Sequence, residues 1–133
     1  MEFRAPLPSE VPAIHALLAA NGWAHRVPDT AWLQKLVERS RCVVAVSAGE
    51  IVGFARGVTD GLSNGYLSMV VVAQEHRRGG VGSNLVRAVL DEEPGITWVL
   101  RAERPGARQF FEVFGFTVSA TAMERKREQR HET

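Results

Sequence analysis

The sequence is poor in the features that mark secreted, membrane-spanning or nucleic-acid-binding proteins. Its 133 residues include one cysteine, Cys42, so no disulfide can form within the chain. Cys42 lies in the apolar run over residues 42–46, and we expect a buried core thiol rather than a nucleophile. No apolar stretch reaches the roughly 18 residues that a membrane span requires. A formal net charge of +1 favours neither nucleic acid nor an anionic membrane as a partner.

The remaining composition is that of an ordinary soluble domain. Hydrophobic residues make up 45% and charged residues 23% of the chain, which is typical of a globular protein. We expect one domain over residues 1–123, followed by a charged tail over residues 124–133 that lacks apolar periodicity and stays disordered. Scarce cysteine and the lack of a basic-then-apolar leader favour the cytoplasm. We expect no metal site.

Apolar periodicity predicts alternating strands and helices. We expect helices that begin near Ser9 and Thr30, and two further helices over residues 81–90 and 105–114. Strands are expected over residues 2–5, 42–47, 51–59, 66–72, 96–102 and 116–123. The order β-α-α-β-β-β-α-β-α-β describes a mixed α/β domain with antiparallel hairpins in its middle. The strand–helix–strand unit over residues 66–102 adds parallel pairing with a right-handed crossover.

The stretch HRRGGVGSNL, residues 76–85, lies between an expected strand and an expected helix. The first amides of a helix lack partners inside it and carry the positive end of its dipole. Glycines next to these amides leave room for an anion and permit left-handed backbone angles, so successive N–H groups can point inward. We therefore predict a site for a phosphate or a diphosphate. The residues expected to contribute are Arg77, Arg78, Gly79, Gly80, Val81, Gly82 and Ser83.

Other interpretations of this stretch fit less well or stay open. A nucleotide-hydrolase loop requires a Gly-Lys-Ser/Thr triplet, and none follows Gly82. A dinucleotide fingerprint that starts at Gly80 requires a small residue at the position of Leu85. A flexible turn with two solvated arginines remains the alternative, because short glycine motifs also arise by chance.

The chain resembles the GNAT superfamily of acyl-CoA N-acyltransferases. The turn sequence RRGGVG, residues 77–82, matches the family motif Arg/Gln-x-x-Gly-x-Gly. Three stretches resemble the family's third strand, its fourth strand with phosphate loop and helix, and its terminal helix and strand: GFARGVTDG, YLSMVVVAQEHRRGGVGSNLV and ARQFFEVFGF. The resemblance covers roughly residues 42–120. It implies the GNAT fold, a central mixed sheet flanked by helices.

The resemblance also implies acetyl-CoA as cofactor and a place for it. The pantetheine arm of coenzyme A would lie in a V-shaped opening between the fourth and fifth strands and pair with the fourth like an extra strand. An N–H near Val70 would polarise the thioester carbonyl, and amides from Arg78 to Ser83 would hold the diphosphate. Further contacts would come from Val71, Val72, Arg104, Ala107, Phe110 and Phe111. For the two phenylalanines, core packing is the alternative.

The sequence departs from the family at both acid–base positions. Many members have a carboxylate where Ser68 or Met69 stands, which deprotonates the amine, and a tyrosine where Phe111 stands, which protonates the thiolate. General acid–base help is typically worth about 10²–10⁴-fold, so another group or a weakly basic amine has to make up for the missing base. The candidate catalytic residues are Ser68, Asp60, Glu103 and Tyr66, each with a solvated or structural role as its alternative.

Three functions remain compatible with the sequence. The first is an acetyl-CoA-dependent N-acetyltransferase that acts on a small-molecule primary amine by direct attack, without a covalent enzyme intermediate. The second is an acyl-CoA-binding sensor or regulatory module without turnover, and the third is a protein-modifying acyltransferase with a wide acceptor groove. We expect the acceptor to meet residues 22–30 and 59–65, and His15 to lie at the surface. Because many relatives are dimers, a homodimer is expected.

Overall fold

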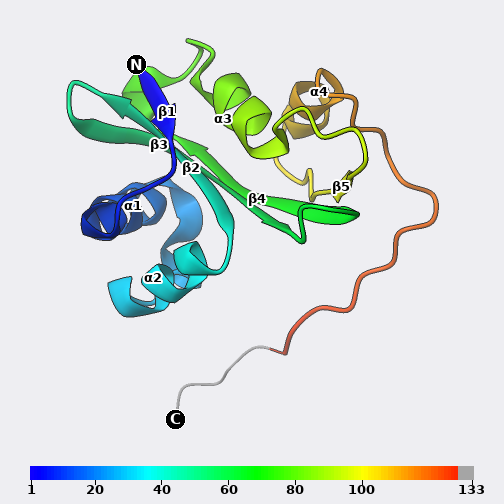
Figure 1. The fold of residues 1–133 in the computed structure, drawn as a ribbon, viewed down its shortest axis with the longest axis horizontal. Coiled ribbons are helices and arrows are strands. Elements are labelled where there is room, and N and C mark those ends of the chain that lie inside the picture. The colour runs from blue at the N-terminus through cyan, green and yellow to red at the C-terminus, as the bar shows by residue number, and fades with distance from the viewer. Residues whose placement is uncertain (129–133) are drawn as a thin grey trace. The chain divides into compact units, whose positions relative to one another are not determined.

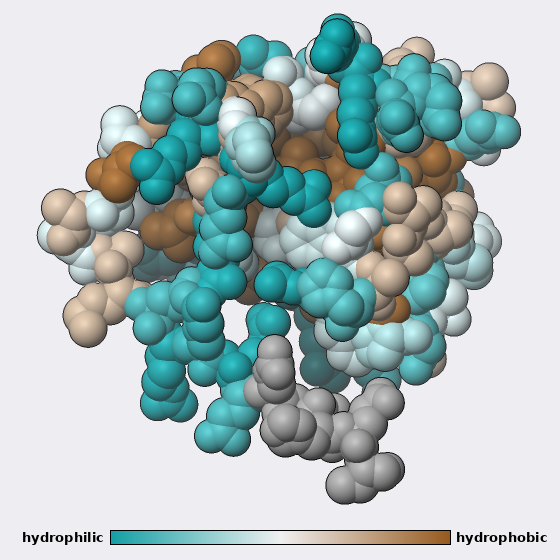
Figure 2. All heavy atoms as spheres, turned by 180° about the vertical axis from the view of Figure 1, so that it is seen from behind, coloured by the Kyte–Doolittle hydropathy of each residue, from teal (hydrophilic) through white to brown (hydrophobic). Residues whose placement is uncertain are grey.

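The computed structural model describes residues 1–128. Backbone contacts divide the chain into two compact units, Met1–Arg101 and Ala102–Thr133. Hydrophilic side chains cover most of the surface that Figure 2 shows. Within the described residues, the helices are too short or too polar to cross a membrane.

The first unit is built on one five-stranded sheet (Figure 1). In spatial order, which is also chain order, its strands are β1 (Glu2–Arg4), β2 (Arg41–Ser47), β3 (Glu50–Thr59), β4 (Asn64–Val72) and β5 (Thr97–Val99). The strands β1 to β4 are antiparallel neighbours, and β5 runs parallel to β4. The predicted mixed sheet with antiparallel hairpins is therefore confirmed. The β2–β3 turn places Ala48 and Gly49 at φ 49° and 79°, the left-handed pair that a two-residue hairpin favours.

Helices cover both faces of this sheet (Figure 1). The helices α1 (Val11–Leu18) and α2 (Thr30–Glu38) lie on one face, and α3 (Val81–Leu90) lies on the other. Four short helical turns connect these elements: η1 (Pro8–Glu10), η2 (Ala19–Trp23), η3 (Ala24–Arg26) and η4 (Gln74–His76). The helix α2 begins at Thr30, as the sequence predicts, and the side chain of Asp29 caps it by accepting a 2.8 Å hydrogen bond from the Trp32 amide.

The start of α1 at Val11 differs from the prediction of a helix that begins near Ser9. The prediction is wrong because a 3₁₀ turn over Pro8–Glu10 precedes the helix. The Glu10 carboxylate accepts a 2.7 Å bond from the Leu7 amide and two bonds from the Arg4 guanidinium, which hold its pKa down to about 2. A carboxylate therefore satisfies the free Leu7 amide at the start of this turn.

The face under α1 and α2 holds the main apolar core. Its fully buried side chains come from both helices, from the connection between them and from β2 and β3, and Met69 of β4 joins them at 7% exposure. The fully buried members are Ile14, Leu18, Val27, Leu33, Val44 and Phe54. Cys42 is buried in the same cluster, as predicted. Burial raises the pKa of its thiol to about 11, so the thiol stays protonated at neutral pH.

The opposite face brings α3 and β5 close to glycines of β3 and β4. A Cβ at Gly57 would lie 2.6 Å from Val89 Cγ1 of α3 and 3.1 Å from the ring of Trp98. A Cβ at Gly65 would lie 2.5 Å from the same ring. All three separations are shorter than ordinary van der Waals contact, so the helix and the indole approach this closely only because the strands have no side chain here.

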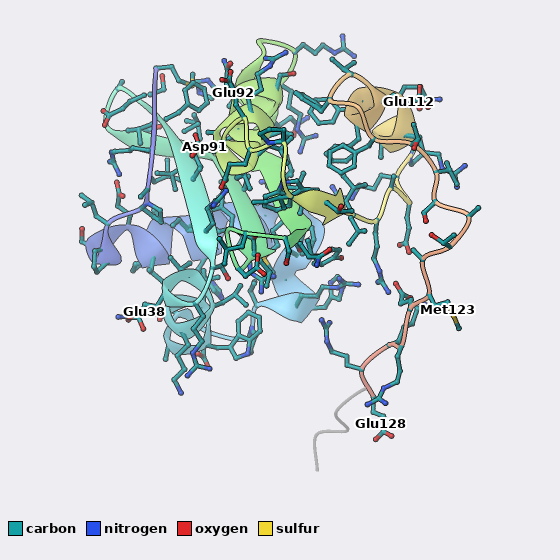
Figure 3. All side chains as sticks on the ribbon, turned by 45° about the vertical axis from the view of Figure 1, so that its right-hand side comes forward. Glu38, Asp91, Glu92, Glu112, Met123 and Glu128 are labelled. Atoms are coloured by element: carbon teal, nitrogen blue, oxygen red, sulfur yellow. The ribbon has the colours of Figure 1, made fainter. Side chains whose placement is uncertain are left out.

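The C-terminal end of α3 collects acidic residues. Figure 3 shows Asp91 and Glu92 there, both with a φ of 50°. Carboxylates at a helix C-terminus oppose the helix dipole. Arg41 of β2 offsets them, since its guanidinium donates a 2.9 Å bond to the Val89 carbonyl and pairs with Glu93. The opposite end of α3, where the glycine-rich turn lies, keeps its positive character.

Over its described residues, 102–128, the second unit contains one short helix, α4 (Ala107–Glu112), within the predicted range 105–114. Around it, phenylalanine rings meet edge to face, with centroids 4.9 Å apart for Phe110 and Phe111 and 5.9 Å apart for Phe111 and Phe116. The predicted strand over residues 116–123 is not formed, although the structure describes all of these residues. A β-branched pattern becomes a strand only where a neighbouring strand supplies the hydrogen bonds.

Two further predictions concern the strand after α3 and the C-terminal tail. The strand predicted over residues 96–102 is only three residues long, because its ladder with β4 ends at the pair Tyr66 and Val99. In the tail, residues 124–128 form no helix or strand. The disorder expected for residues 129–133 lies outside the described residues.

Candidate functional site

One edge of β4 changes its pairing halfway along the strand. The parallel ladder with β5 joins Asn64–Tyr66 to Thr97–Val99 and stops there, while β4 continues to Val72. In the described chain, no strand pairs with this edge of β4 beyond Tyr66. An unpaired strand edge can accept another extended chain through its N–H and C=O groups.

Main-chain geometry identifies the groups on this edge. The Ala73 amide donates a 2.8 Å bond to Val52 of β3, so Ala73 faces β3. Because successive residues of a strand present their polar groups to opposite edges, Val72 and, two residues back, Val70 face the unpaired edge. Val71 is directly opposite Phe54 and is buried. Val70 and the Val72 amide, two of the expected pantetheine contacts, thus face the unpaired edge, while the Val72 carbonyl already accepts a bond from Arg77.

A bulge interrupts β4 beside this edge. Phe54 is opposite Val71 and Arg56 is opposite Ser68, so Met69 and Val70 together face one residue of β3. Met69 has a φ of 54°, which is unusual for a residue with a side chain. Bulges of this kind bend a strand and redirect its polar groups, and they occur often next to active sites. At this bulge the Met69 side chain packs into the core with 7% exposure.

The glycine-rich turn follows directly after β4 and η4. Arg78 and Gly80 both have left-handed backbone angles, with φ 68° and 82°, and α3 begins at Val81. A Cβ at Gly80 would meet nothing within 4 Å, so the space above the turn is open. Residues 78–80 are exposed, and the first amides of α3 point out of the helix without partners inside it. An open space lined by amides and a helix dipole fits an anionic diphosphate.

The side chain of Arg77 has partners that the sequence did not suggest. Its Nε donates a 3.1 Å bond to the Val72 carbonyl, and its Nη2 donates a 2.8 Å bond to Oδ1 of Asn21 in η2. The expectation that this guanidinium adds donors for a diphosphate therefore changes: two of its donors are bonded to protein. The other arginine of the turn, Arg78, is exposed.

Asp60 is fully engaged in the β3–β4 hairpin. Its carboxylate accepts bonds from the Leu62 and Ser63 amides at 2.8 Å and from the Ser63 hydroxyl at 2.7 Å. These bonds, those from Ser63 above all, hold the pKa of Asp60 well below its usual range. A carboxylate stabilised in this way is a weak base, so the geometry favours the structural role for Asp60 over the catalytic one.

Tyr66 and Ser68 share one face of the sheet with residues of β3. Tyr66 is directly opposite Val58, and Ser68 is directly opposite Arg56, so all four side chains point to the side that holds α1 and α2. Tyr66 and Ser68 are half-buried. The Arg56 Nε donates a 2.9 Å bond to the Ser40 hydroxyl at the end of α2. This face offers two hydroxyl groups next to the bulge.

The remaining candidates belong to the second unit. Glu103 and Arg104 are exposed, and Ala107, Phe110 and Phe111 are half-buried. Phe110 and Phe111 each contact two aromatic rings of their own unit. These contacts agree with core packing, the alternative role for both residues.

Sequence reasoning missed two residues that fix the segment between α1 and α2. His15, expected at the surface, is half-buried, and its Nε2–H donates a 2.9 Å bond to the Val27 carbonyl. Asn21 donates a 2.7 Å bond to the Leu17 carbonyl while it accepts from Arg77. A signal existed for Asn21, since Asn-Gly at a helix end is a common stop.

Solved structures of acetyltransferases share the fold. A protein from Xanthomonas campestris pv. campestris assigned to the GNAT family matches with a TM-score of 0.78 at 24% identity, over 94% of this chain and 92% of that one. Ribosomal-protein-alanine N-acetyltransferase from Brucella melitensis biovar Abortus 2308 matches with a TM-score of 0.74 at 22% identity, over 96% and 100%. An aminoglycoside 6'-N-acetyltransferase complexed with coenzyme A matches with a TM-score of 0.61 at 22% identity, over 69% and 54%.

The family assignment rests on the sequence itself. No curated protein sequence matches the chain. The family model described as acetyltransferase (GNAT) domain matches residues 38–118. This span includes the unpaired edge of β4, the glycine-rich turn and α3, which are the parts that the resemblance had singled out. The chain therefore belongs to the GNAT acetyltransferase family.

Proposed function

We propose that this protein is an acetyl-CoA-dependent N-acetyltransferase that transfers an acetyl group to the primary amine of a small molecule. One observation carries the proposal: the unpaired edge of β4 leads directly into an open turn at the positive end of α3. These two features together suit a ligand with an amide-rich arm and a diphosphate. The similar aminoglycoside enzyme is complexed with coenzyme A, which supports the same cofactor here.

The chain's own residues would hold acetyl-CoA in two places. Main-chain groups of Val70 and Val72 would bond the pantetheine arm, with Val71 between them anchoring the strand in the core. Amides from Arg78 to Ser83 would bind the diphosphate, with the Arg78 side chain adding charge. Bound acetyl-CoA supplies an activated acyl carbon. We keep Arg104, Ala107, Phe110 and Phe111 as proposed contacts from the second unit.

The proposed transfer needs little help from the enzyme at the leaving group. A neutral amine attacks the thioester carbon, the C–N bond forms, the C–S bond breaks, sulfur leaves as thiolate, and the nitrogen loses one proton to solvent. A thiol with a pKa of about 8.5 departs without a strong acid near neutral pH. The N–H near Val70 would stabilise charge on the carbonyl oxygen during attack.

Removal of the proton from the acceptor amine before attack requires more help from the protein. An alkylamine with a pKa of about 10.4 is neutral in only about one molecule in two thousand at pH 7. The hydroxyls of Ser68 and Tyr66 can orient an amine, and the lowered pKa of Asp60 makes it a weak base. We therefore propose that the acceptor is a weakly basic amine or loses its proton to solvent, with Glu103 as the remaining carboxylate candidate.

A second candidate function is an acyl-CoA sensor without turnover. The observation that favours it is the absence of a carboxylate at Ser68 and Met69 and of a tyrosine at Phe111. One experiment separates the two functions. Acetyl-CoA is titrated by calorimetry, and release of free thiol is then followed with a panel of alkyl, aromatic and aminoglycoside amines. Binding with thiol release supports the enzyme, binding without release supports the sensor, and no binding contradicts both.

A further inference from the structure

Arg77 joins two parts of the first unit that are distant in sequence. Its guanidinium donates to the Val72 carbonyl at the end of β4 (3.1 Å) and to Asn21 in η2 (2.8 Å), 56 positions earlier in the chain. The fork of an arginine allows both bonds from one rigid group. Asn21 in turn donates to the Leu17 carbonyl in the last turn of α1 (2.7 Å), so a continuous hydrogen-bonded chain runs from β4 to α1.

The segment after α1 is irregular and depends on such bonds for its position. In η2, Asn21 has φ −122° and ψ 34°, and Gly22 has φ 91°, so neither residue is helical. At its far end, the His15 imidazole donates to the Val27 carbonyl (2.9 Å), which ties the segment to α1. The bond from Arg77 is different, because it ties the segment to the strand and turn that would hold the cofactor.

The two residues of the Arg77–Asn21 hydrogen bond lie next to different proposed ligand sites. Arg77 immediately precedes the amides of residues 78–83, which would bind the diphosphate. Asn21 immediately precedes the segment that we expect to meet the acceptor, where the Arg26 guanidinium lies 5.6 Å from the centroid of the Trp23 ring. A shift of the turn on cofactor binding would therefore move or fix the acceptor segment through one side chain.

We propose that Arg77 is a positioning residue that couples occupancy of the cofactor turn to the order of the α1–α2 segment. Coenzyme A bound to the turn would hold Arg77 in place and thereby hold Asn21, so the acceptor segment, which the bond between Arg77 and Asn21 already ties to the turn, becomes more rigid when the cofactor is present. The proposal rests on the proposed function, because it takes coenzyme A as the ligand of the turn. Coupling of this kind is reciprocal: an acceptor that orders the segment also tightens binding of the cofactor.

Hydrogen–deuterium exchange with coenzyme A as the probe tests the coupling without knowledge of the acceptor. In the unchanged protein, saturating coenzyme A should slow amide exchange in residues 78–84 and, about fivefold or more, in residues 19–27. In Asn21→Ala, protection of residues 78–84 should persist while protection of residues 19–27 is lost. Arg77→Lys should behave in the same way, since a lysine cannot make both bonds of the fork.

Two control variants separate coupling from general loosening. His15→Ala removes the other anchor of the segment, so exchange in residues 19–27 should rise with and without coenzyme A, yet a protective effect of coenzyme A should remain. Arg78→Ala should weaken coenzyme A binding, but at saturation residues 19–27 should still be protected. A melting curve on each variant checks that the fold is kept.

The outcomes distinguish the inference from the function on which it rests. Protection of residues 78–84 without protection of residues 19–27 in the unchanged protein overturns the coupling and leaves the cofactor site standing. Protection of residues 19–27 that survives in both Asn21→Ala and Arg77→Lys also overturns it. Protection in neither region at saturating coenzyme A overturns the coupling and the proposed function together.

Discussion

Replacement of Gly80 by alanine tests the glycine-rich turn with a single methyl group. Gly80 has a φ of 82°, and a Cβ there would meet nothing within 4 Å. The protein itself therefore has room for the methyl group, and only the left-handed backbone opposes it. That penalty is about 1–2 kcal/mol per residue. Lower entropy of the unfolded chain returns about 0.4–1 kcal/mol, so we expect a net loss of roughly 1 kcal/mol, or about 4 °C in Tm.

The effect on cofactor binding should be larger than the effect on stability. The added methyl group extends into the open space in which the diphosphate would lie. Loss of one charge-assisted amide–phosphate bond is worth about 1.5–3 kcal/mol, which corresponds to a roughly 10- to 100-fold weaker Kd for coenzyme A. Isothermal titration calorimetry measures this change directly.

Gly49 provides a matched control for Gly80. It has nearly the same backbone angle, φ 79°, and a Cβ there also meets nothing within 4 Å, but it lies in the β2–β3 turn. Gly49→Ala should lower Tm by a similar amount and leave the Kd for coenzyme A unchanged. Equal affinities of Gly80→Ala and the unchanged protein, or equal weakening in both variants, would refute the assignment of the turn to the diphosphate.

Three further predictions follow from the packing and the titrating groups. Gly57→Ala should destabilise the fold by about 1–3 kcal/mol in urea unfolding, because its Cβ would lie 2.6 Å from Val89 Cγ1, and an unchanged midpoint would contradict the close packing of α3. The folded-state pKa of Asp60 is lowered, so its contribution to stability is present above its unfolded pKa of about 3.9 and is lost as pH falls through the folded value. Asp60→Ala should therefore flatten the acid side of a Tm-against-pH profile while turnover near neutral pH persists, and a complete loss of turnover would instead assign Asp60 to catalysis. The Cys42 thiol, buried with its pKa raised to about 11, should resist iodoacetamide at mildly alkaline pH until the protein is unfolded in guanidinium, and rapid labelling of folded protein would contradict its burial.

Local patterns were sufficient to predict most elements and the turn. The apolar spacing of Val81, Leu85 and Val89 marks a helical face, and all three side chains are buried against the sheet. Asp29 caps α2 because a capping side chain needs only neighbours within three residues. The left-handed φ of Gly80 is also a local feature, because a glycine before a helix leaves the backbone free to adopt it.

Features that depend on distant partners could not be predicted from the sequence. The bond between Arg77 and Asn21 joins positions 56 residues apart, and no local pattern indicates it. The glycines at 57 and 65 suggested strand or turn positions, whereas their role is to admit the ring of Trp98. The strand expected over residues 116–123 has suitable residues, but strand formation depends on a partner edge that local sequence does not specify.

A crystal structure of the protein with coenzyme A tests the central claim most directly. We expect the diphosphate oxygens within hydrogen-bond distance of main-chain amides of residues 78–83, and the pantetheine arm extended along β4 with bonds to Val70 and Val72. Coenzyme A bound elsewhere, or bound with these amides turned away from the diphosphate, would contradict the account.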